Sequence, residues 1–319
     1  MAETFAGRYL LLEPIGEGGM GTVWRVEDLK QNREVAAKIL RQSHSTSLLR
    51  FVREQSLRIH HPHVLMPLGW AGEDDRVLFT MPIVAGGSLA TLVGDYGPLP
   101  PLFVAEVLRQ IASALIAVHE GRLIHRDVKP ANILLDATGA GRPHAYLTDF
   151  GIAVELDGPR FTETGLVTGT PGYLAPELAA LGDPAPASDA YSLGSVGLHM
   201  LTGVRPQDVP RGGAAPAGVP GALWETLVAL TGPDPQLRMS LPDALAQLEA
   251  PELAWHDGAA GEVEVFDHFA PEPSAEPGAG AQLAPEPGEA AGRRLSTRDL
   301  LVFGFFGLLM ILGIVLLLL

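Results

Sequence analysis

The chain has 319 residues, 47% of them hydrophobic, which is enough to bury a substantial core. Its formal net charge of −15 argues against a nucleic-acid partner, because binding to a phosphate backbone depends on basic patches. The absence of cysteine excludes disulfides, thiolate catalysis and cysteine-based zinc sites. The first ten residues, MAETFAGRYL, lack the pattern of a signal peptide and fit a cytosolic domain.

Short apolar runs separated by glycine-rich and charged turns predict β-strands over residues 8–90, with one helix near residues 47–58. The runs are, in chain order, YLLLEPI, GTVWRVE, EVAAKIL, VLMPLGWA and RVLFTMPIV. Apolar residues at helical spacing then predict helices in three later segments, at 103–120, 187–202 and 222–230. A strand-rich first third followed by a helix-rich remainder predicts two lobes with a site between them.

The segment after residue 250 has a different composition. Residues 251–292 contain nine acidic residues and no Lys or Arg, are rich in Pro, Ala and Gly, and show no periodicity. Such a segment buries too little apolar surface to offset its chain entropy, so we predict a disordered linker.

The last twenty residues, 300–319, carry no charge and match the hydrocarbon core of a bilayer, about 30 Å thick. The alternative is a buried soluble helix, although such helices rarely stay apolar on every face over this length. A basic juxtamembrane segment, 293–299, contains Arg293, Arg294 and Arg298 and places the preceding chain in the cytoplasm. We therefore expect a single-pass anchor in the cell membrane, with the C-terminus at the outer face and no extracellular sensor.

The first chemical motif is a G-x-G-x-x-G formed by Gly16, Gly18 and Gly21 between two strand-like runs. Glycines let a backbone approach phosphates closely and direct N–H groups at them. The motif alone is weak in a chain with 37 glycines. A Rossmann turn would need a helix after the last glycine, whereas residues 22–26 have a strand pattern. We therefore predict a glycine hairpin over a nucleotide.

The second motif is the strand Val35–Ile39, which carries Lys38, one of only three lysines against nineteen arginines. A cation on the inward face of an apolar strand is costly unless it is paired. One interpretation assigns it ATP phosphates and a carboxylate partner, and the other places it at a strand edge. Glu54, on the helix expected between the third and fourth strands, is the only acidic residue between Ile39 and Gly72 and is the candidate partner.

Two further motifs supply the parts that phosphoryl transfer requires. In the run IHRDVKPAN, Asp127 offers a base, Lys129 a cation for phosphate and Asn132 a metal-binding amide. In the run TDFG, Asp149 offers a hard carboxylate for Mg²⁺.

Together with Ala175-Pro176-Glu177, these motifs follow the order and approximate spacing of the eukaryotic-type (Hanks-type) protein kinase superfamily. The sequence resembles bacterial membrane-anchored Ser/Thr kinases of this type over residues 8–250. The resemblance implies an α+β, bilobal, protein-kinase-like fold, with a β-rich N-lobe at about 8–84 and an α-rich C-lobe at about 85–250.

The resemblance also implies ATP and Mg²⁺ as cofactors, with Mn²⁺ as a substitute. It makes Asp127 the acceptor of the substrate hydroxyl proton and places Lys129 on the γ-phosphate. It places Lys38 on the α- and β-phosphates, held by Glu54. The residues implied to bind metal are Asn132 and Asp149, and those implied to bind the nucleotide further include Ile15, Gly16, Gly18, Gly21, Val23, Ala36, Met81, Pro82, Val84 and Leu134.

The sequence departs from the family pattern at two places. Pro82 stands where many kinases carry Glu, but its carbonyl and the Val84 N–H are still available to adenine. The distance from Glu54 to His61 is shorter than the family usually shows, which puts the placement of Glu54 in doubt.

Further residues have supporting roles by resemblance. Glu177 would pair with Arg238, and Asp189 would support the catalytic loop, which is the run IHRDVKPAN at residues 124–132. Arg126 would pair with a phosphorylated residue of the activation segment, residues 151–175, and Thr170 of that segment would contact the catalytic loop. His125 and Phe150 complete the structural set.

Three threonines, Thr162, Thr164 and Thr168, are candidate phosphorylation sites, with ordinary loop residues as the alternative.

The predicted function is a membrane-tethered, ATP-dependent protein Ser/Thr kinase that autophosphorylates its activation loop. Lys129 within D-V-K-P-A-N resembles Ser/Thr rather than tyrosine kinases. Expected partners are protein substrates, some of them membrane-associated, and the lipid bilayer; homodimerisation is left open. The alternatives are a catalytically silent pseudokinase that acts as a membrane-anchored binding module, and a small-molecule phosphotransferase.

Overall fold

The computed structural model describes residues 3–18, 21–41, 59–149, 154–155, 170–209 and 214–270. The chain divides into two units, 1–270 and 271–319. The second unit, which contains the predicted transmembrane helix, lies outside the described residues, as does the helix predicted near residues 47–58.

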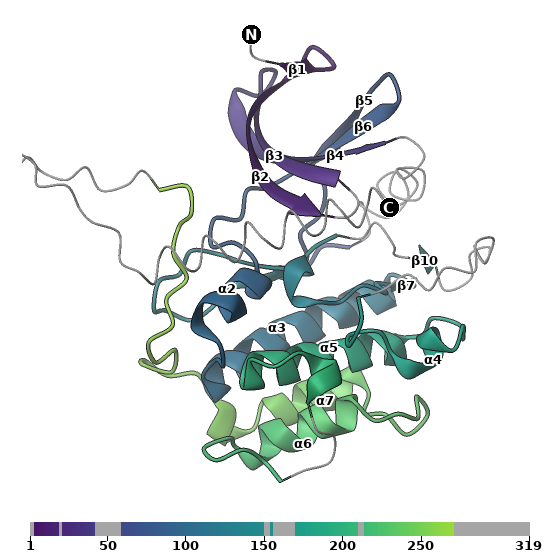
Figure 1. The fold of residues 1–319 in the computed structure, drawn as a ribbon, viewed down its shortest axis with the longest axis vertical. Helices are drawn as coiled ribbons and strands as arrows, with labels where there is room; N and C mark the ends of the chain where they lie inside the picture. The colour runs from purple at the N-terminus through teal and green to yellow at the C-terminus, as the bar shows by residue number, and fades with distance from the viewer. Residues whose placement is uncertain are drawn as a thin grey trace, which may run out of the picture. The chain divides into compact units, whose positions relative to one another are not determined.

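An antiparallel sheet of six strands forms the N-lobe (Figure 1). Its strands are β1 (Thr4–Phe5), β2 (Tyr9–Gly18), β3 (Gly21–Asp28), β4 (Arg33–Arg41), β5 (Gly69–Glu73) and β6 (Arg76–Met81). Their order in the sheet is β1-β2-β3-β4-β6-β5, so the predicted β-rich first part is confirmed. Two boundaries differ from the prediction. The fourth predicted run, VLMPLGWA, corresponds to β5, which begins at Gly69 rather than at Val64. The fifth run corresponds to β6, which ends before Pro82 because proline has no N–H to donate to a neighbouring strand.

The alternation of side chains along β4 divides the sheet into two faces. Val35 and Ala37 are buried in a small apolar cluster with Phe5, Tyr9, Leu11, Val26 and Leu78. Ala36 and Lys38 point to the opposite face. In the register, Val23 lies opposite Lys38 and Ala36 lies opposite Met81. Four predicted site residues on three strands therefore share one face of the sheet.

The C-lobe is built mainly of helices packed around α3 (Pro101–Glu120), as Figure 1 shows. The other helices are α2 (Leu89–Tyr96), α4 (Pro176–Ala179), α5 (Pro186–Thr202), α6 (Gly221–Leu230) and α7 (Leu241–Leu248). The three helices predicted from periodicity correspond to α3, α5 and α6. By length and composition α3 could cross a membrane, but two thirds of its most apolar stretch is buried, as in the core helix of a soluble domain.

Short elements between the helices carry the candidate chemistry. They are β7 (Leu123–Ile124), the 3₁₀ turn η1 (Pro130–Asn132), β8 (Ile133–Leu135), β9 (Ala145–Leu147) and β10 (Val154–Glu155). β8 and β9 form an antiparallel pair, and β7 pairs with β10. A further 3₁₀ turn, η3 (Pro206–Asp208), follows α5.

The chain does not leave the domain at residue 250. A 3₁₀ turn, η4 (Pro251–Leu253), continues α7, and Leu253, Ala260, Val263 and Val265 are buried. The prediction of a disordered linker from residue 251 is therefore wrong for residues 251–270. These apolar residues have irregular spacing, which a search for helical or strand periodicity does not detect.

Candidate active site

The three glycines of the motif lie at the end of β2 and the start of β3. Gly18 lies opposite Gly21 and Gly16 opposite Val23 in an antiparallel register, as the hairpin prediction requires. Gly21 has a φ of 152°, and a Cβ there would lie 2.3 Å from the carbonyl oxygen of Ile39. A side chain at Gly21 would therefore push the hairpin away from β4.

Lys38 extends from β4 to the C-lobe, where its Nζ lies 2.6 Å from Oδ2 of Asp149. Both side chains are largely sheltered from solvent, so each charge is compensated by the other. Asp149 has a left-handed φ of 70°, a strained conformation of the kind that occurs at functional sites. The predicted partner Glu54 and the neighbour Phe150 lie outside the described residues, so their roles stay predictions.

The carboxylate of Asp127 is fixed by two donors on its own loop. Its Oδ2 lies 2.7 Å from Nζ of Lys129 and accepts a 2.9 Å hydrogen bond from Nδ2 of Asn132. The same Asn132 amide also donates to the Asp127 backbone oxygen, at 2.8 Å. One carboxylate oxygen of Asp127 is thus oriented, and the oxygen of the Asn132 amide remains as a ligand for a cation.

The β8–β9 pair brings Asn132 and Asp149 together. Asn132 directly precedes Ile133, which pairs with Leu147, and Asp149 follows Leu147 by two residues. The Thr148 N–H also donates to the Asn132 carbonyl at 3.0 Å. Oxygen ligands from one amide and one carboxylate fit Mg²⁺, which keeps several waters and takes its other ligands from substrate phosphates. In the described ranges no three His, Asp or Glu side chains converge as a complete protein cage.

Asp189, in the first turn of α5, supports the catalytic loop from a fully buried position. Its two oxygens accept the backbone N–H groups of His125 and Arg126, both at 2.8 Å. Nε2 of His119 lies 2.8 Å from the same carboxylate. Arg126 has a left-handed φ of 68°, so these bonds stabilise a backbone that would otherwise relax.

The other supporting residues lie close to their predicted partners where the structure describes them. Oε1 and Oε2 of Glu177 accept hydrogen bonds from Arg238 at 2.7 and 3.0 Å. Burial is the largest influence on the Glu177 carboxyl and raises its pKa. The hydrogen bonds and positive charge of Arg238, together with hydrogen bonds from the Glu177 backbone and Ser188, outweigh burial and leave the pKa below its ordinary value. The His125 ring lies 3.0 Å from the Thr148 carbonyl through Nε2. Thr170 is half-buried, and its contact to the catalytic loop stays a prediction.

The candidate nucleotide residues lie on two groups of strands. One group is the sheet face described above, and Ile15 lies on β2 of the same sheet. The other is β8, where Leu134 pairs with Ser88 at the start of α2. Pro82 and Val84 follow β6 directly, in the segment that joins the lobes. Figure 1 shows this junction between the sheet and α2.

The structure adds two groups of residues that the sequence motifs do not indicate. One is His119, which stands in an amphipathic helix and gives no signal of its contact with Asp189. The other is a buried network around Glu106 on α3, which includes Arg109 and Arg142. An acidic residue inside the apolar run FVAEVLRQI was the available signal, because an unpaired carboxylate would be costly there.

Comparisons with known proteins identify the family to which the chain belongs. The protein kinase domain family matches residues 9–213. The chain is 36% identical over 254 residues to the Ser/Thr protein kinase PkaA of Streptomyces coelicolor, which covers 75% of this chain and 45% of PkaA. It is 38% identical over 213 residues to PrkC of Bacillus subtilis, covering 65% of this chain and 32% of PrkC.

A third relative is PknA of Mycobacterium tuberculosis, 36% identical over 255 residues, which covers 77% of this chain and 56% of PknA. All three are described as Ser/Thr protein kinases, and the match spans only about a third to just over half of each. Because the protein kinase domain model matches residues 9–213, well over half of the chain, the chain belongs to the protein kinase family.

Proposed function

We propose that the chain is an ATP-dependent protein Ser/Thr kinase that transfers the γ-phosphoryl group to protein hydroxyls. The observation that carries this proposal is the Asp127 carboxylate, oriented by Lys129 and Asn132 on a loop joined to Asp149. Phosphoryl transfer is catalysed mainly by positioning and by charge stabilisation, and these residues supply both.

Each described residue has a distinct task in this proposal. Asp127 accepts the proton of the attacking Ser or Thr hydroxyl through the carboxylate that Lys129 and Asn132 orient. Lys129, 2.7 Å from that carboxylate, is placed to move to the γ-phosphoryl oxygens when substrates bind. Lys38 would bind the α- and β-phosphates, and the oxygens of Asn132 and Asp149 would hold Mg²⁺. The bound cation would neutralise the negative charge that develops on the phosphate oxygens.

Specificity for Ser and Thr is supported by Lys129 and by the printed names of the relatives. Purified full-length chain should transfer label from radiolabelled ATP with Mg²⁺ to a basic test protein, and acid hydrolysis should release phosphoserine or phosphothreonine. An Asp127→Ala variant should transfer none. A wild-type chain that binds ATP but labels nothing would instead support the pseudokinase alternative.

We also propose regulation by phosphorylation of the activation segment. In support, burial lowers the pKa of the Arg126 guanidinium, and the charge of the nearby Asp189 carboxylate offsets this only in part. A phosphate on Thr162, Thr164 or Thr168 would supply a further negative charge for this guanidinium and order the segment. Mass spectrometry of active enzyme tests this, and a segment that is always unmodified would refute it.

The membrane anchor is likewise a proposal, supported by the twenty uncharged residues at 300–319 and the arginines before them. It would bring the kinase close to membrane-associated substrates. The full chain should remain in the membrane fraction after alkaline carbonate extraction, and a variant lacking residues 300–319 should not. Equal extraction of both would contradict the anchor.

A further inference from the structure

The segment 251–270, here called the strap, leaves the end of α7 and returns along the C-lobe to the junction of the two lobes. Figure 1 shows it as the yellow-green segment beside α2. Its apolar residues Leu253, Ala260, Val263 and Val265 are buried, while Phe266 is 59% exposed. The strap is thus a bound part of the kinase domain.

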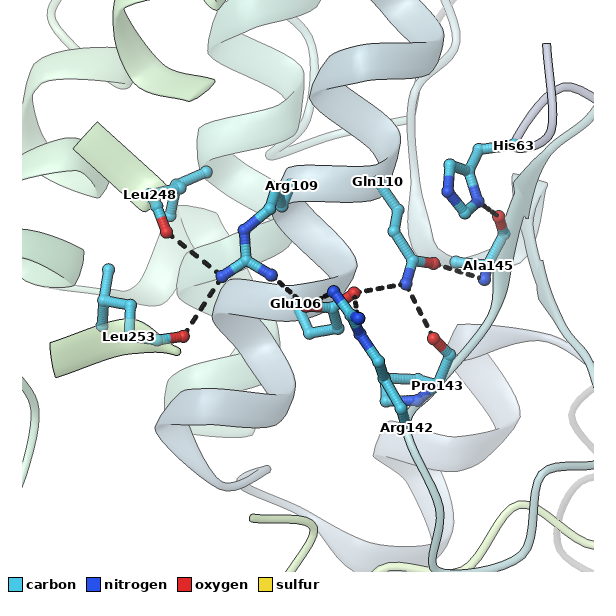
Figure 2. A network of polar contacts seen from close by, with 9 residues as sticks. All are labelled: His63, Glu106, Arg109, Gln110, Arg142, Pro143, Ala145, Leu248 and Leu253. Carbon is cyan, nitrogen blue, oxygen red and sulfur yellow. Dashed lines mark hydrogen bonds and ion pairs between the residues drawn. The ribbon is translucent and has the colours of Figure 1, made fainter. Parts of the chain in front are cut away.

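The base of the strap is fixed by a buried polar network on α3, which Figure 2 shows. Nη2 of Arg109 donates to the carbonyl of Leu248, at the end of α7, and to that of Leu253 in the strap, both at 3.1 Å. Arg109 also forms an ion pair with Glu106, which is 2% exposed. The first turn of the strap, η4, is therefore hydrogen-bonded to α3.

The same network reaches the loop between β8 and β9. Arg142 donates to both carboxylate oxygens of Glu106, at 2.8 and 3.1 Å. Gln110 donates to Glu106 and to the Pro143 carbonyl, both at 2.7 Å, and accepts the Ala145 N–H at 2.7 Å (Figure 2). This loop connects β8, which follows Asn132, to β9, which precedes Asp149. The network on α3 therefore contacts both the base of the strap and the loop between the strands next to the candidate metal ligands.

The far end of the strap is bonded to the same loop. Val265 and Gly139 exchange two backbone hydrogen bonds, at 2.9 and 3.0 Å. The Tyr96 hydroxyl, on α2, accepts the Glu264 N–H at 3.2 Å and donates to the Glu264 carbonyl at 3.3 Å. Both β8–β9 and α2 therefore bind the last third of the strap.

Beyond this point the strap contacts the chain that leaves the junction between the lobes. The His268 N–H donates to the carbonyl of Ala85 at 2.9 Å. A Cβ at Gly86 would lie 2.5 Å from Cγ1 of Val265, and one at Gly87 would lie 2.9 Å from the His268 ring. Strap side chains thus occupy the space that side chains at these two glycines would need.

The contacted residues directly follow Val84, whose N–H is the proposed donor to adenine. On their other side they are bonded to β8, because the Gly86 N–H donates to the Leu135 carbonyl and the Leu135 N–H to that of Gly87, both at 2.9 Å. The backbone after Val84 therefore lies between β8 and the strap. Loss of the strap bond would free one side of this backbone.

We propose that the strap is a positioning element for nucleotide binding, with the His268 N–H and the Val265 side chain fixing the backbone that follows Val84. This inference rests on the proposed function only in that Val84 binds the adenine of ATP. It assigns to residues 251–270 a role in ATP affinity rather than in the chemical step.

The test uses the full-length chain and a His268→Pro variant, which removes the N–H that bonds to Ala85. Proline suits this position, because Asp267 accepts the N–H groups of Phe269 and Ala270 and so begins a turn at residue 268. His268→Ala is the matched control, since it retains the N–H. ATP affinity is measured by direct titration with a fluorescent ATP analogue, and KM for ATP and kcat are measured with a protein substrate.

We expect His268→Pro to weaken ATP binding about three- to tenfold, the effect of one lost hydrogen bond, with kcat at saturating ATP unchanged. His268→Ala should weaken it less. An unchanged ATP affinity with a lowered Tm would overturn the inference, because a strap that only stabilises the domain would change stability and not ATP binding.

A second pair of variants keeps the inference testable should His268→Pro fail to fold. Val265→Ala removes the methyl groups beside Gly86 and should raise KM for ATP, whereas the exposed Phe266→Ala should not; equal effects of the two would overturn the inference. Direct titration does not need catalysis. A chain that binds ATP without phosphoryl transfer would therefore refute the proposed kinase activity and leave the role of the strap open to the same measurement.

Discussion

Replacement of Asp189 by asparagine tests whether the buried carboxylate fixes the catalytic loop. The two carboxylate oxygens accept the N–H groups of His125 and Arg126, both at 2.8 Å, and the residue is fully buried. An asparagine amide has one oxygen, so its NH₂ group must face one of the two N–H donors. One charge-assisted bond is lost and one buried donor is left unsatisfied, at a cost of about 3 kcal/mol of folding free energy.

This cost corresponds to a fall in Tm of about 6–12 °C for a domain of this size. Activity should fall further than stability explains, because Asp127 follows Arg126 directly and misplacement of a catalytic group by about 1 Å reduces rates roughly a hundredfold. Stability is measured by denaturant unfolding, and kcat is measured at a temperature below the unfolding transition of the variant. The exposed Asp95→Asn, with the same change of charge, is the matched control. An Asp189→Asn variant as stable and active as this control would refute the reasoning.

Three further changes test other contacts. Lys38→Met removes the cation beside Asp149 and should lower kcat/KM for ATP about 10²–10³-fold; steady-state rates within threefold of wild type would contradict its phosphate-binding role. Arg238→Lys replaces a two-pronged contact with Glu177 by a single one and should cost about 2 kcal/mol in denaturant unfolding; no loss would show that the pair is dispensable. Burial raises the pKa of Glu106, but the hydrogen bonds from its partners outweigh this and leave the pKa below the ordinary value of 4.5. The stability that this carboxylate contributes is therefore complete above about pH 4.5 and lost as pH falls through the lower folded-state pKa. A Glu106→Gln variant should be less stable than wild type at pH 7 with the difference narrowing under acid conditions, and a gap independent of pH would contradict this.

The parts of the site that lie on regular elements could be predicted from sequence. Lys38 and Ala36 share a strand face because side chains alternate, and the strand pattern after Gly21 correctly predicted a hairpin. Asn132 and Asp149 flank a strand pair, so their proximity follows from the motif order. These features depend on residues that are close together in the sequence, so a local pattern is enough to predict them.

The interactions that were missed join residues distant in sequence. His119 contacts Asp189 across seventy positions, and Arg109 reaches Leu253 across 144. The strap was predicted as linker because its buried residues follow neither a helical nor a strand period. These residues are buried by contacts with elements that are distant in sequence, and a local sequence pattern does not predict such contacts.

The most direct test of the central claim is the initial rate of phosphoryl transfer by full-length Asp127→Asn, compared with wild type at equal ATP occupancy. Asparagine preserves the shape of the side chain but cannot accept the hydroxyl proton. The account predicts a fall of about 10²–10⁴ in the rate, with the Kd for ATP unchanged within twofold. A variant that transfers phosphate at the wild-type rate, or a wild-type chain that transfers none, would contradict it.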